Sequence, residues 1–209
     1  VITDPQGNEH KLVLPMPGRF NVANALVALA VSELAGLPIE DALAGIAHVV
    51  VPGRLQRIDE GQDYLAIVDY AHKPAAVAAV IATLRSEIKG RLCVVLGAGG
   101  DRDASKRVIM GREAARGSDL FIVTDDNPRS EDPAVIRAAV EAGAYELPTE
   151  ERGEVRNIGD RAAAIRAAIA WAEPGDAVLV AGKGHETGQN VNGVIHHFDD
   201  REEVRAALQ

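Results

Sequence analysis

Residues 124–129, Thr-Asp-Asp-Asn-Pro-Arg, bring two carboxylates, an amide and a guanidinium together directly after the apolar run Leu120–Val123. Carboxylates bind ammonium groups, and a guanidinium binds a carboxylate through two parallel hydrogen bonds. The combination therefore suits a small zwitterion such as an amino acid. The alternative is a capped loop, because Asp, Asn and Pro are ordinary turn residues and Asp132 before Pro133 is typical of a helix start.

Three other apolar runs are also followed by glycines or charged residues. Tyr-Ala-His-Lys-Pro occupies residues 70–74, Gly-Ala-Gly-Gly-Asp-Arg-Asp residues 97–103, and Gly-Lys-Gly-His-Glu residues 182–186. In an open parallel sheet, ligands bind beyond the carboxyl ends of the strands. We therefore expect a polar ligand site where these four segments meet.

Two common nucleotide motifs are missing from the sequence. The glycine run at 97–100 begins like a dinucleotide fingerprint, but Arg102 holds the place of the third glycine, which disfavours that interpretation. No Gly-x-x-x-x-Gly-Lys-Ser/Thr motif occurs. A dinucleotide oxidoreductase is therefore disfavoured, and a phosphate-binding P-loop is absent from this sequence.

The elements that would position these residues alternate between strand and helix from residue 54 onward. Apolar runs predict strands at 55–59, 65–69, 92–96, 120–124 and 177–181. Helical periodicity predicts helices at 75–88, 106–116, 133–142, 160–172 and 200–208. This alternation predicts an α/β fold with a doubly wound, mostly parallel, Rossmann-like sheet.

The first fifty residues have a different pattern. Strands are predicted at 1–3 and 11–14, a helix from the segment 17–24 to residue 34, and a second helix at 38–47. Asn21 and Asn24 would share one face at the start of the first helix, either as caps or as amides that contact a nucleotide. We expect one unit at 1–50, a second at 51–209, and a chain cut from a longer protein.

Composition excludes several classes of protein. The 209 residues are 47% hydrophobic but only 3% aromatic, which favours an aliphatic core. A formal net charge of −9 argues against general nucleic-acid binding. No apolar run is long enough to span a membrane, no signal peptide is evident, and the single Cys93 excludes an internal disulfide. We expect a cytoplasmic protein without membrane insertion.

Together these motifs resemble the Mur ligase family of peptidoglycan synthesis. The resemblance rests on residues 18–24, 53–54, 69–74, 99–103, 106–107, 126–129 and 182–186, and it covers essentially the whole chain. It implies that 1–50 is the end of the central ATP-binding domain and 51–209 is the C-terminal ligase domain. The Asp-Asn-Pro-Arg at 126–129 is similar to the signature of members that add meso-diaminopimelate, since Arg129 would hold the carboxylate that lysine lacks.

The resemblance also implies roles for individual residues. The diaminopimelate contacts would be Arg102, Asp126, Asn127, Arg129, Gly182 and Glu186, with Glu186 receiving the distal ammonium group. The ATP contacts would be Asn21, Asn24, Arg54, Asp69, Tyr70 and His72. Arg54 and Asp69 would also be catalytic, and no metal ligand is assigned to this chain.

The implied reaction joins diaminopimelate to UDP-MurNAc-L-Ala-D-Glu. ATP would phosphorylate the substrate carboxylate, Mg²⁺ would neutralise the transferred group, and the amine would attack the acyl phosphate. The family's P-loop, magnesium ligands and UDP-binding domain have no counterpart in this sequence, so we expect the isolated chain to be inactive. Two alternatives stay open: a ligase that adds glutamate to folate, and a non-catalytic module that keeps the amino-acid pocket.

Overall fold

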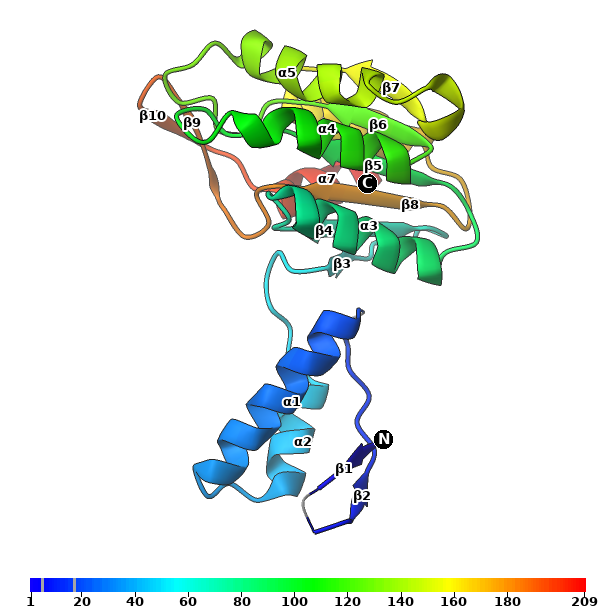
Figure 1. Cartoon of the computed structure of the whole chain (residues 1–209), viewed down its shortest axis with the longest axis vertical. Helices are drawn as coiled ribbons and strands as arrows, with labels where there is room; N and C mark the ends of the chain where they lie inside the picture. Colours follow the sequence, from blue (N-terminus) through cyan, green and yellow to red (C-terminus); the bar gives the residue numbers. More distant parts are fainter. Residues whose placement is uncertain (5, 17) are drawn as a thin grey trace. The chain divides into compact units, whose positions relative to one another are not determined.

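The structure is a computed structural model that describes residues 1–4, 6–16 and 18–209 (Figure 1). Pro5, Pro17 and the side chain of Arg19 lie outside the described residues. The chain divides into two compact units, Val1–Val51 and Pro52–Gln209, and each is described separately.

The first unit contains a two-stranded ladder and two helices. The strands β1 (Ile2–Thr3) and β2 (Glu9–His10) pair antiparallel. They are followed by α1 (Arg19–Leu34) and α2 (Ile39–Ala47). The core of this unit is small, with Ala25, Leu29 and Leu43 as its buried apolar side chains among the described residues.

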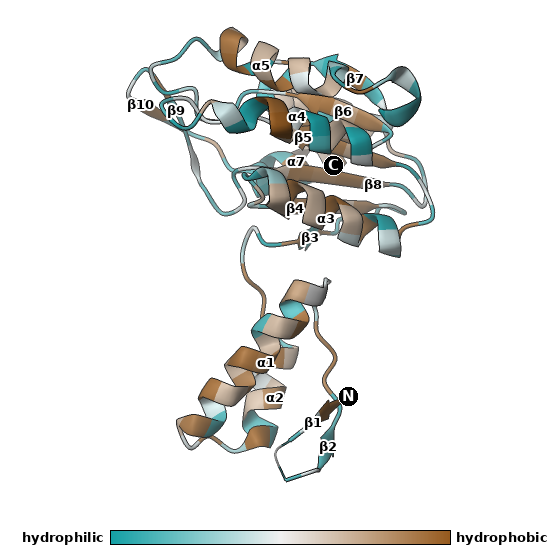
Figure 2. Cartoon of the chain, viewed as in Figure 1, coloured by the Kyte–Doolittle hydropathy of each residue, from teal (hydrophilic) through white to brown (hydrophobic). Residues whose placement is uncertain are grey.

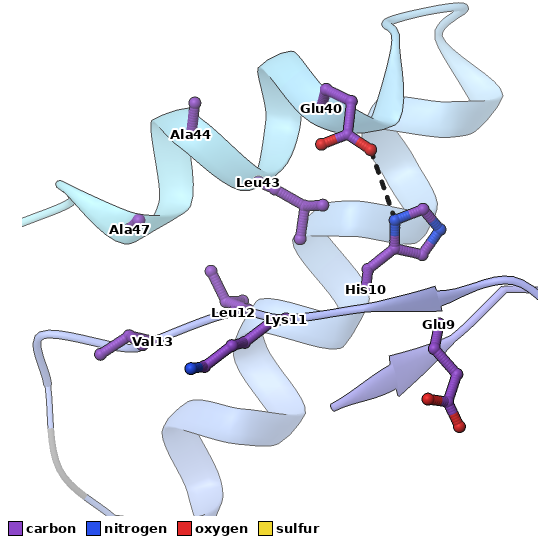
Figure 3. A pocket seen from close by; sticks show the side chains of 9 residues that line it. All are labelled: Glu9, His10, Lys11, Leu12, Val13, Glu40, Leu43, Ala44 and Ala47. Carbon is purple, nitrogen blue, oxygen red and sulfur yellow. Dashed lines mark ion pairs between the residues drawn. The ribbon is translucent and has the colours of Figure 1, made fainter.

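The predicted strand at 11–14 is wrong, because the strand in this region is Glu9–His10. Residues 11–13 instead run along α2, where they line a cavity of about 520 Å³ together with Leu43, Ala44 and Ala47 (Figure 3). Leu12 is partly buried in this segment, whereas Val13 is exposed, so only part of the segment packs toward a helix. A short apolar run alone does not distinguish such packing from sheet pairing.

The second unit is built on a six-stranded sheet in the order β3-β4-β8-β5-β6-β7. Its strands are β3 (Gln56–Ile58), β4 (Leu65–Asp69), β5 (Leu92–Leu96), β6 (Leu120–Val123), β7 (Glu154–Asn157) and β8 (Ala177–Ala181). The pairs from β4 to β7 are parallel, and only β3 is antiparallel to its neighbour. The mostly parallel α/β fold is confirmed.

Helices cover both faces of this sheet. The helices α3 (Pro74–Glu87), α4 (Ser105–Gly117) and α5 (Pro133–Tyr145) pack on one face. The helices α6 (Arg161–Trp171) and α7 (Asp200–Leu208) pack on the other. Side chains alternate between the two cores along each strand, as with Val94 and Val95, because successive residues point to opposite faces. The central strands β5, β6 and β8 are accordingly hydrophobic throughout (Figure 2).

Three strands of the second unit were not predicted. One is the polar edge strand β7, and the other two form the antiparallel hairpin of β9 (Gly188–Val191) and β10 (Val194–His197). A short 3-10 helix, η1 (Thr149–Glu151), precedes β7. The hairpin turn is Asn192-Gly193, and both residues have positive φ, 50° and 81°. Asn-Gly between two short runs is a strong hairpin signal, so this element was present in the sequence and was overlooked.

Candidate functional site

A cavity of about 270 Å³ lies at the carboxyl ends of β4, β5, β6 and β8, within the second unit. All six residues predicted to hold an amino acid line it, and so do Tyr70 and His72. Its lining residues are Tyr70, His72, Gly97, Ala98, Gly99, Arg102, Lys106, Met110, Asp126, Asn127, Arg129, Gly182 and Glu186. The four segments singled out from the sequence therefore meet at one cavity.

The sheet topology explains why the cavity lies beside β8. The connections that leave β4, β5 and β6 run through α3, α4 and α5 on one face of the sheet, whereas the connection that leaves β8 leads through the hairpin to α7 on the other face. Strand β8 lies between β4 and β5, whose outgoing connections take the first of these faces. Adjacent strands whose connections leave toward opposite faces create a crevice at their carboxyl ends, which is where open α/β sheets bind ligands.

Asn127 and Glu186 form the centre of one wall. Asn127 Nδ2 donates to Glu186 Oε2 over 2.9 Å, and Asn127 Oδ1 accepts from the backbone N–H of Asn190 over 2.9 Å. Asn127 is buried, whereas the Glu186 side chain is 37% exposed. The amide therefore holds a carboxylate that remains open toward the cavity.

Arg129 is held in an unusual backbone conformation. Its φ is 53°, a left-handed value that costs a non-glycine residue energy unless other contacts fix it. Those contacts come from the hairpin: Arg129 N–H donates to the Asn190 carbonyl at 3.0 Å, and Asn192 N–H donates to the Arg129 carbonyl at 2.7 Å. The guanidinium donates through Nη1 to the Gly100 carbonyl at 2.7 Å. The overlooked hairpin thus positions Arg129.

The glycine run after β5 allows a close approach between loops. A Cβ atom at Gly100 would lie 1.9 Å from the Pro128 carbonyl oxygen, so a larger residue cannot occupy this position without moving the loop. The buried Arg107 reinforces the contact by donating to both oxygens of Glu131 at 2.8 and 2.9 Å and to the Gly99 carbonyl at 3.2 Å. Glu131 in turn accepts from Asp101 N–H at 2.6 Å. This network fixes the loop that carries Arg102.

Arg161 and Asp200 form a fully buried ion pair beneath the site, with two hydrogen bonds of 2.7 Å. Arg161 also donates to the carbonyls of Ala181 at 2.9 Å and Asp125 at 3.4 Å, the residues that precede Gly182 and Asp126. Burial alone would lower the pKa of Arg161, but the nearby carboxylates, Asp200 first and then Asp126 and Glu186, together outweigh burial and raise the pKa. A permanent buried cation therefore connects two of the loops that form the cavity.

A cluster of rings borders the cavity. Tyr70 stacks edge-on with His72 at 4.6 Å and tilts against His185 at 5.1 Å, while the guanidinium of Arg54 lies 4.5 Å from the centre of the Tyr70 ring. His72 Nδ1 donates to the Tyr70 carbonyl at 2.9 Å. Arg54 lies next to the cavity rather than in its wall. The cluster offers flat faces and a cation to a ligand.

Asp69 is placed behind the cavity wall. Its carboxylate accepts from the N–H groups of Leu55 at 2.7 Å and Ala71 at 2.8 Å. Burial raises the pKa of Asp69, and these hydrogen bonds and the charge of Arg54 offset part of that rise. The observed contacts tie β3 to the loop after β4. The catalytic role implied by the resemblance stays a prediction.

Asn21 and Asn24 belong to the first unit. Both lie inside α1, whose N-cap residue is Gly18, so the interpretation as helix caps is wrong. They do share one face of the helix, since Asn24 Nδ2 donates to Asn21 Oδ1 at 3.3 Å. Their contact with a nucleotide stays a prediction.

Several residues that build the site were not singled out from the sequence. Lys183 is fully buried, Gln189 donates from Nε2 to the Asp126 carbonyl at 2.8 Å, and Lys106 lines the cavity. Lys183 and Lys106 lie within the sequence motifs described above, so the motifs predict that both are near the site. The motifs do not predict which groups the two lysines contact. Gln189 and Asn190 required the hairpin to be recognised.

The described parts of both units contain no group of three or more His, Cys, Asp or Glu side chains that could hold a metal ion. Among the same residues, no helix has the length and apolar character needed to cross a bilayer. The cavity of the first unit in Figure 3 is lined by none of the predicted site residues.

A family model and a curated relative both indicate one family. Residues 53–184 match the family model described as "Mur ligase, glutamate ligase domain". The chain is 62% identical to the UDP-N-acetylmuramoyl-L-alanyl-D-glutamate–2,6-diaminopimelate ligase of Corynebacterium efficiens, over 100% of the chain and 40% of that protein. The chain thus spans about two fifths of the length of this curated relative.

Two solved structures extend the comparison. A structure of UDP-N-acetylmuramoyl-L-alanyl-D-glutamate–2,6-diaminopimelate ligase matches with a TM-score of 0.72 and 39% identity, covering 99% of this chain and 41% of that one. The Mycobacterium tuberculosis folylpolyglutamate synthase complexed with ADP and AMPPCP matches with a TM-score of 0.63 and 26% identity, covering 84% of this chain and 40% of that one.

Proposed function

Because this chain belongs to the Mur ligase family, we propose that it is the amino-acid-binding part of an ATP-dependent ligase that adds meso-diaminopimelate to UDP-MurNAc-L-Ala-D-Glu. The relative from Corynebacterium efficiens carries the name of that activity and matches the whole chain. The finer assignment of the amino acid depends on the cavity.

The observation that carries the proposal is the placement of Arg129 and Glu186 in the wall of one cavity. Diaminopimelate has two amino acid ends, each with an ammonium and a carboxylate. A guanidinium can bind the distal carboxylate through two hydrogen bonds, and Glu186 can accept from the distal ammonium. Lysine has the distal ammonium but no distal carboxylate, so it would leave Arg129 without its ligand.

The remaining residues complete a polar cage. Arg102 adds a second cation to the wall, while the Asn127 amide and the Gly182 carbonyl offer polar groups that carry no net charge. Asp126 places a carboxylate beside Gly182. Charge-assisted hydrogen bonds contribute about 1.5–3 kcal/mol each, enough for strong discrimination between two similar amino acids.

ATP is the proposed second substrate, as the ADP and AMPPCP complexes of the structurally similar folylpolyglutamate synthase suggest. The ring cluster of Arg54, Tyr70 and His72 fits a nucleotide base or its phosphates by stacking and charge. Mg²⁺ is a different case, because the described residues offer no cluster of ligands for it, and we assign it no step in this chain. The cytoplasmic location stays a prediction.

A hybrid enzyme tests the proposal. The C-terminal two fifths of the Corynebacterium efficiens relative, the part that this chain matches, would be replaced by this chain. ADP release would be measured with ATP, UDP-MurNAc-L-Ala-D-Glu and either meso-diaminopimelate or L-lysine, with the unaltered relative as control. We expect diaminopimelate-dependent ADP release and none with lysine.

The same assay separates the alternatives. Equal turnover of lysine, or turnover only with glutamate and a folate acceptor, would contradict the proposal. A folded hybrid that binds diaminopimelate but releases no ADP would favour a non-catalytic binding module.

A further inference from the structure

Lys183 carries a charge but is not among the residues proposed to contact diaminopimelate. Its side chain has no exposed surface, although it lies between Gly182 and Glu186 in sequence. Removing an ammonium group from water costs several kcal/mol unless ion pairing and hydrogen bonds compensate. The partners of Lys183 therefore indicate what the group stabilises.

The ammonium group contacts three acceptors. Lys183 Nζ donates to the Gly188 carbonyl at 2.6 Å and to Asn127 Oδ1 at 3.3 Å, and it lies 3.5 Å from Glu186 Oε2. An ammonium has three donors and no acceptor, so three acceptors match its capacity. Lys183 thereby joins the loop after β6, the loop after β8 and the first residue of the hairpin.

These contacts determine which way the Asn127 amide points. Its oxygen faces two donors, the Lys183 ammonium and the Asn190 N–H. Rotating the amide by half a turn would place its NH₂ group against both donors, which is unfavourable. The nitrogen is therefore directed at Glu186, where it donates at 2.9 Å.

We propose that Lys183 is a positioning residue of the acceptor site, because its buried ammonium fixes the Asn127 amide and the Glu186 carboxylate in the orientation that receives the distal ammonium of diaminopimelate. This rests on the proposed function. Lys183 lies behind the cavity wall and not in it, so it acts through these two residues.

Two substitutions test this. Lys183→Met keeps an unbranched side chain but removes the charge and all donors, whereas Lys183→Gln restores a donor without the charge. Lys89→Met, at an exposed position, is the control. By calorimetric titration, we expect Lys183→Met to bind meso-diaminopimelate at least about tenfold more weakly than the unsubstituted chain. The affinity of Lys183→Gln should lie between these two. The affinity of Lys89→Met should equal that of the unsubstituted chain.

Thermal unfolding shows whether each variant is folded. Parent-like affinity in Lys183→Met overturns the proposal. If Lys183→Met does not fold, the affinity of Lys183→Gln for meso-diaminopimelate is the test. An affinity equal to that of the unsubstituted chain overturns the proposal. In the hybrid enzyme, a rise in KM for diaminopimelate with an unchanged KM for ATP supports positioning, whereas equal losses for both substrates indicate a general structural role and contradict it.

An experiment without ligand separates this inference from the proposed function. The side-chain amide signals of Asn127 would be followed by nuclear magnetic resonance in the unsubstituted chain and in both Lys183 variants. If the unsubstituted chain and the hybrid both fail to take diaminopimelate, the proposed function fails. Altered Asn127 signals then still support positioning by Lys183, and unchanged signals overturn it.

Discussion

Asn127 Nδ2 donates a hydrogen bond of 2.9 Å to Glu186 Oε2, and this contact joins the loop after β6 to the loop after β8. The two residues are 59 positions apart in the sequence and come from strands separated by β5. Because both also contact Lys183, a change at any of the three is expected to affect the other two.

Replacing Glu186 with Gln removes the charge proposed to bind the distal ammonium of diaminopimelate. The amide oxygen of Gln can still accept from Asn127, so the wall keeps its shape. We expect diaminopimelate binding to weaken by about 10- to 100-fold, the equivalent of one charge-assisted hydrogen bond. Calorimetric titration measures this, with Glu150→Gln at an exposed position of η1 as control. An unchanged affinity would contradict the proposal that Glu186 binds the distal ammonium group.

Gly182→Ala is expected to damage the site more than an ordinary glycine substitution does. Gly182 has φ 117°, and a Cβ atom there would lie 2.7 Å from Asp126 Oδ2. Gly61→Ala is a matched control, because Gly61 has φ 97° but nothing within 4 Å of a Cβ atom. We expect both to lose about 1–3 kcal/mol of unfolding free energy from backbone strain, and only Gly182→Ala to weaken diaminopimelate binding. Equal diaminopimelate affinity in the two variants would contradict the expectation that a Cβ atom at position 182 displaces the Asp126 carboxylate.

Stability at acidic pH is expected to depend on Glu131. The hydrogen bonds from Arg107 lower the pKa of Glu131 below its ordinary value of 4.5. An acid whose folded pKa is lowered stabilises the fold fully above its unfolded pKa, and this contribution is lost as pH falls through the folded pKa. Urea unfolding below pH 4.5 should therefore show a shallower pH dependence in Glu131→Gln than in the unsubstituted chain. The exposed surface variant Glu87→Gln should keep the original slope.

The buried pair of Arg161 and Asp200 is expected to show strong coupling. Arg161→Met would leave the Asp200 carboxylate buried without its partner and should cost about 3–5 kcal/mol of unfolding free energy. Arg161→Met combined with Asp200→Leu removes both charges and should recover a large part of that loss. Chemical denaturation measures both variants. A double variant no more stable than Arg161→Met would contradict the expected cost of an unpaired, buried Asp200 carboxylate.

Much of the second unit is predictable because its central strands are short, continuous apolar runs. The bounds of β4, β5 and β8 match the predicted runs, since a strand buried on both faces contains no polar residue until its end. The polar edge strand β7 gives no such signal, because Glu154 and Asn157 at its ends are exposed to solvent. The Asn192-Gly193 turn does give a local signal, because Asn-Gly between two short runs is typical of a hairpin.

The candidate site was predictable in its membership but not in its contacts. Strand ends identified the loops that line the cavity, because parallel strands bring their carboxyl ends to the same edge. The burial of Lys183, and the hydrogen bonds from the hairpin to Arg129, depend on where a distant segment folds back. Such long-range contacts leave no local pattern in the sequence. The helix-cap interpretation of Asn21 is wrong because α1 begins three residues earlier than a cap at Asn21 requires.

The most direct test of the central claim is a calorimetric titration of this chain with meso-diaminopimelate and, separately, with L-lysine, repeated on Arg129→Ala. Arg57→Ala, on the exposed part of β3, is the control. We predict that diaminopimelate binds, that lysine gives no signal, and that Arg129→Ala alone abolishes binding. Binding of lysine as tight as that of diaminopimelate, or diaminopimelate binding that survives in Arg129→Ala, would contradict the account.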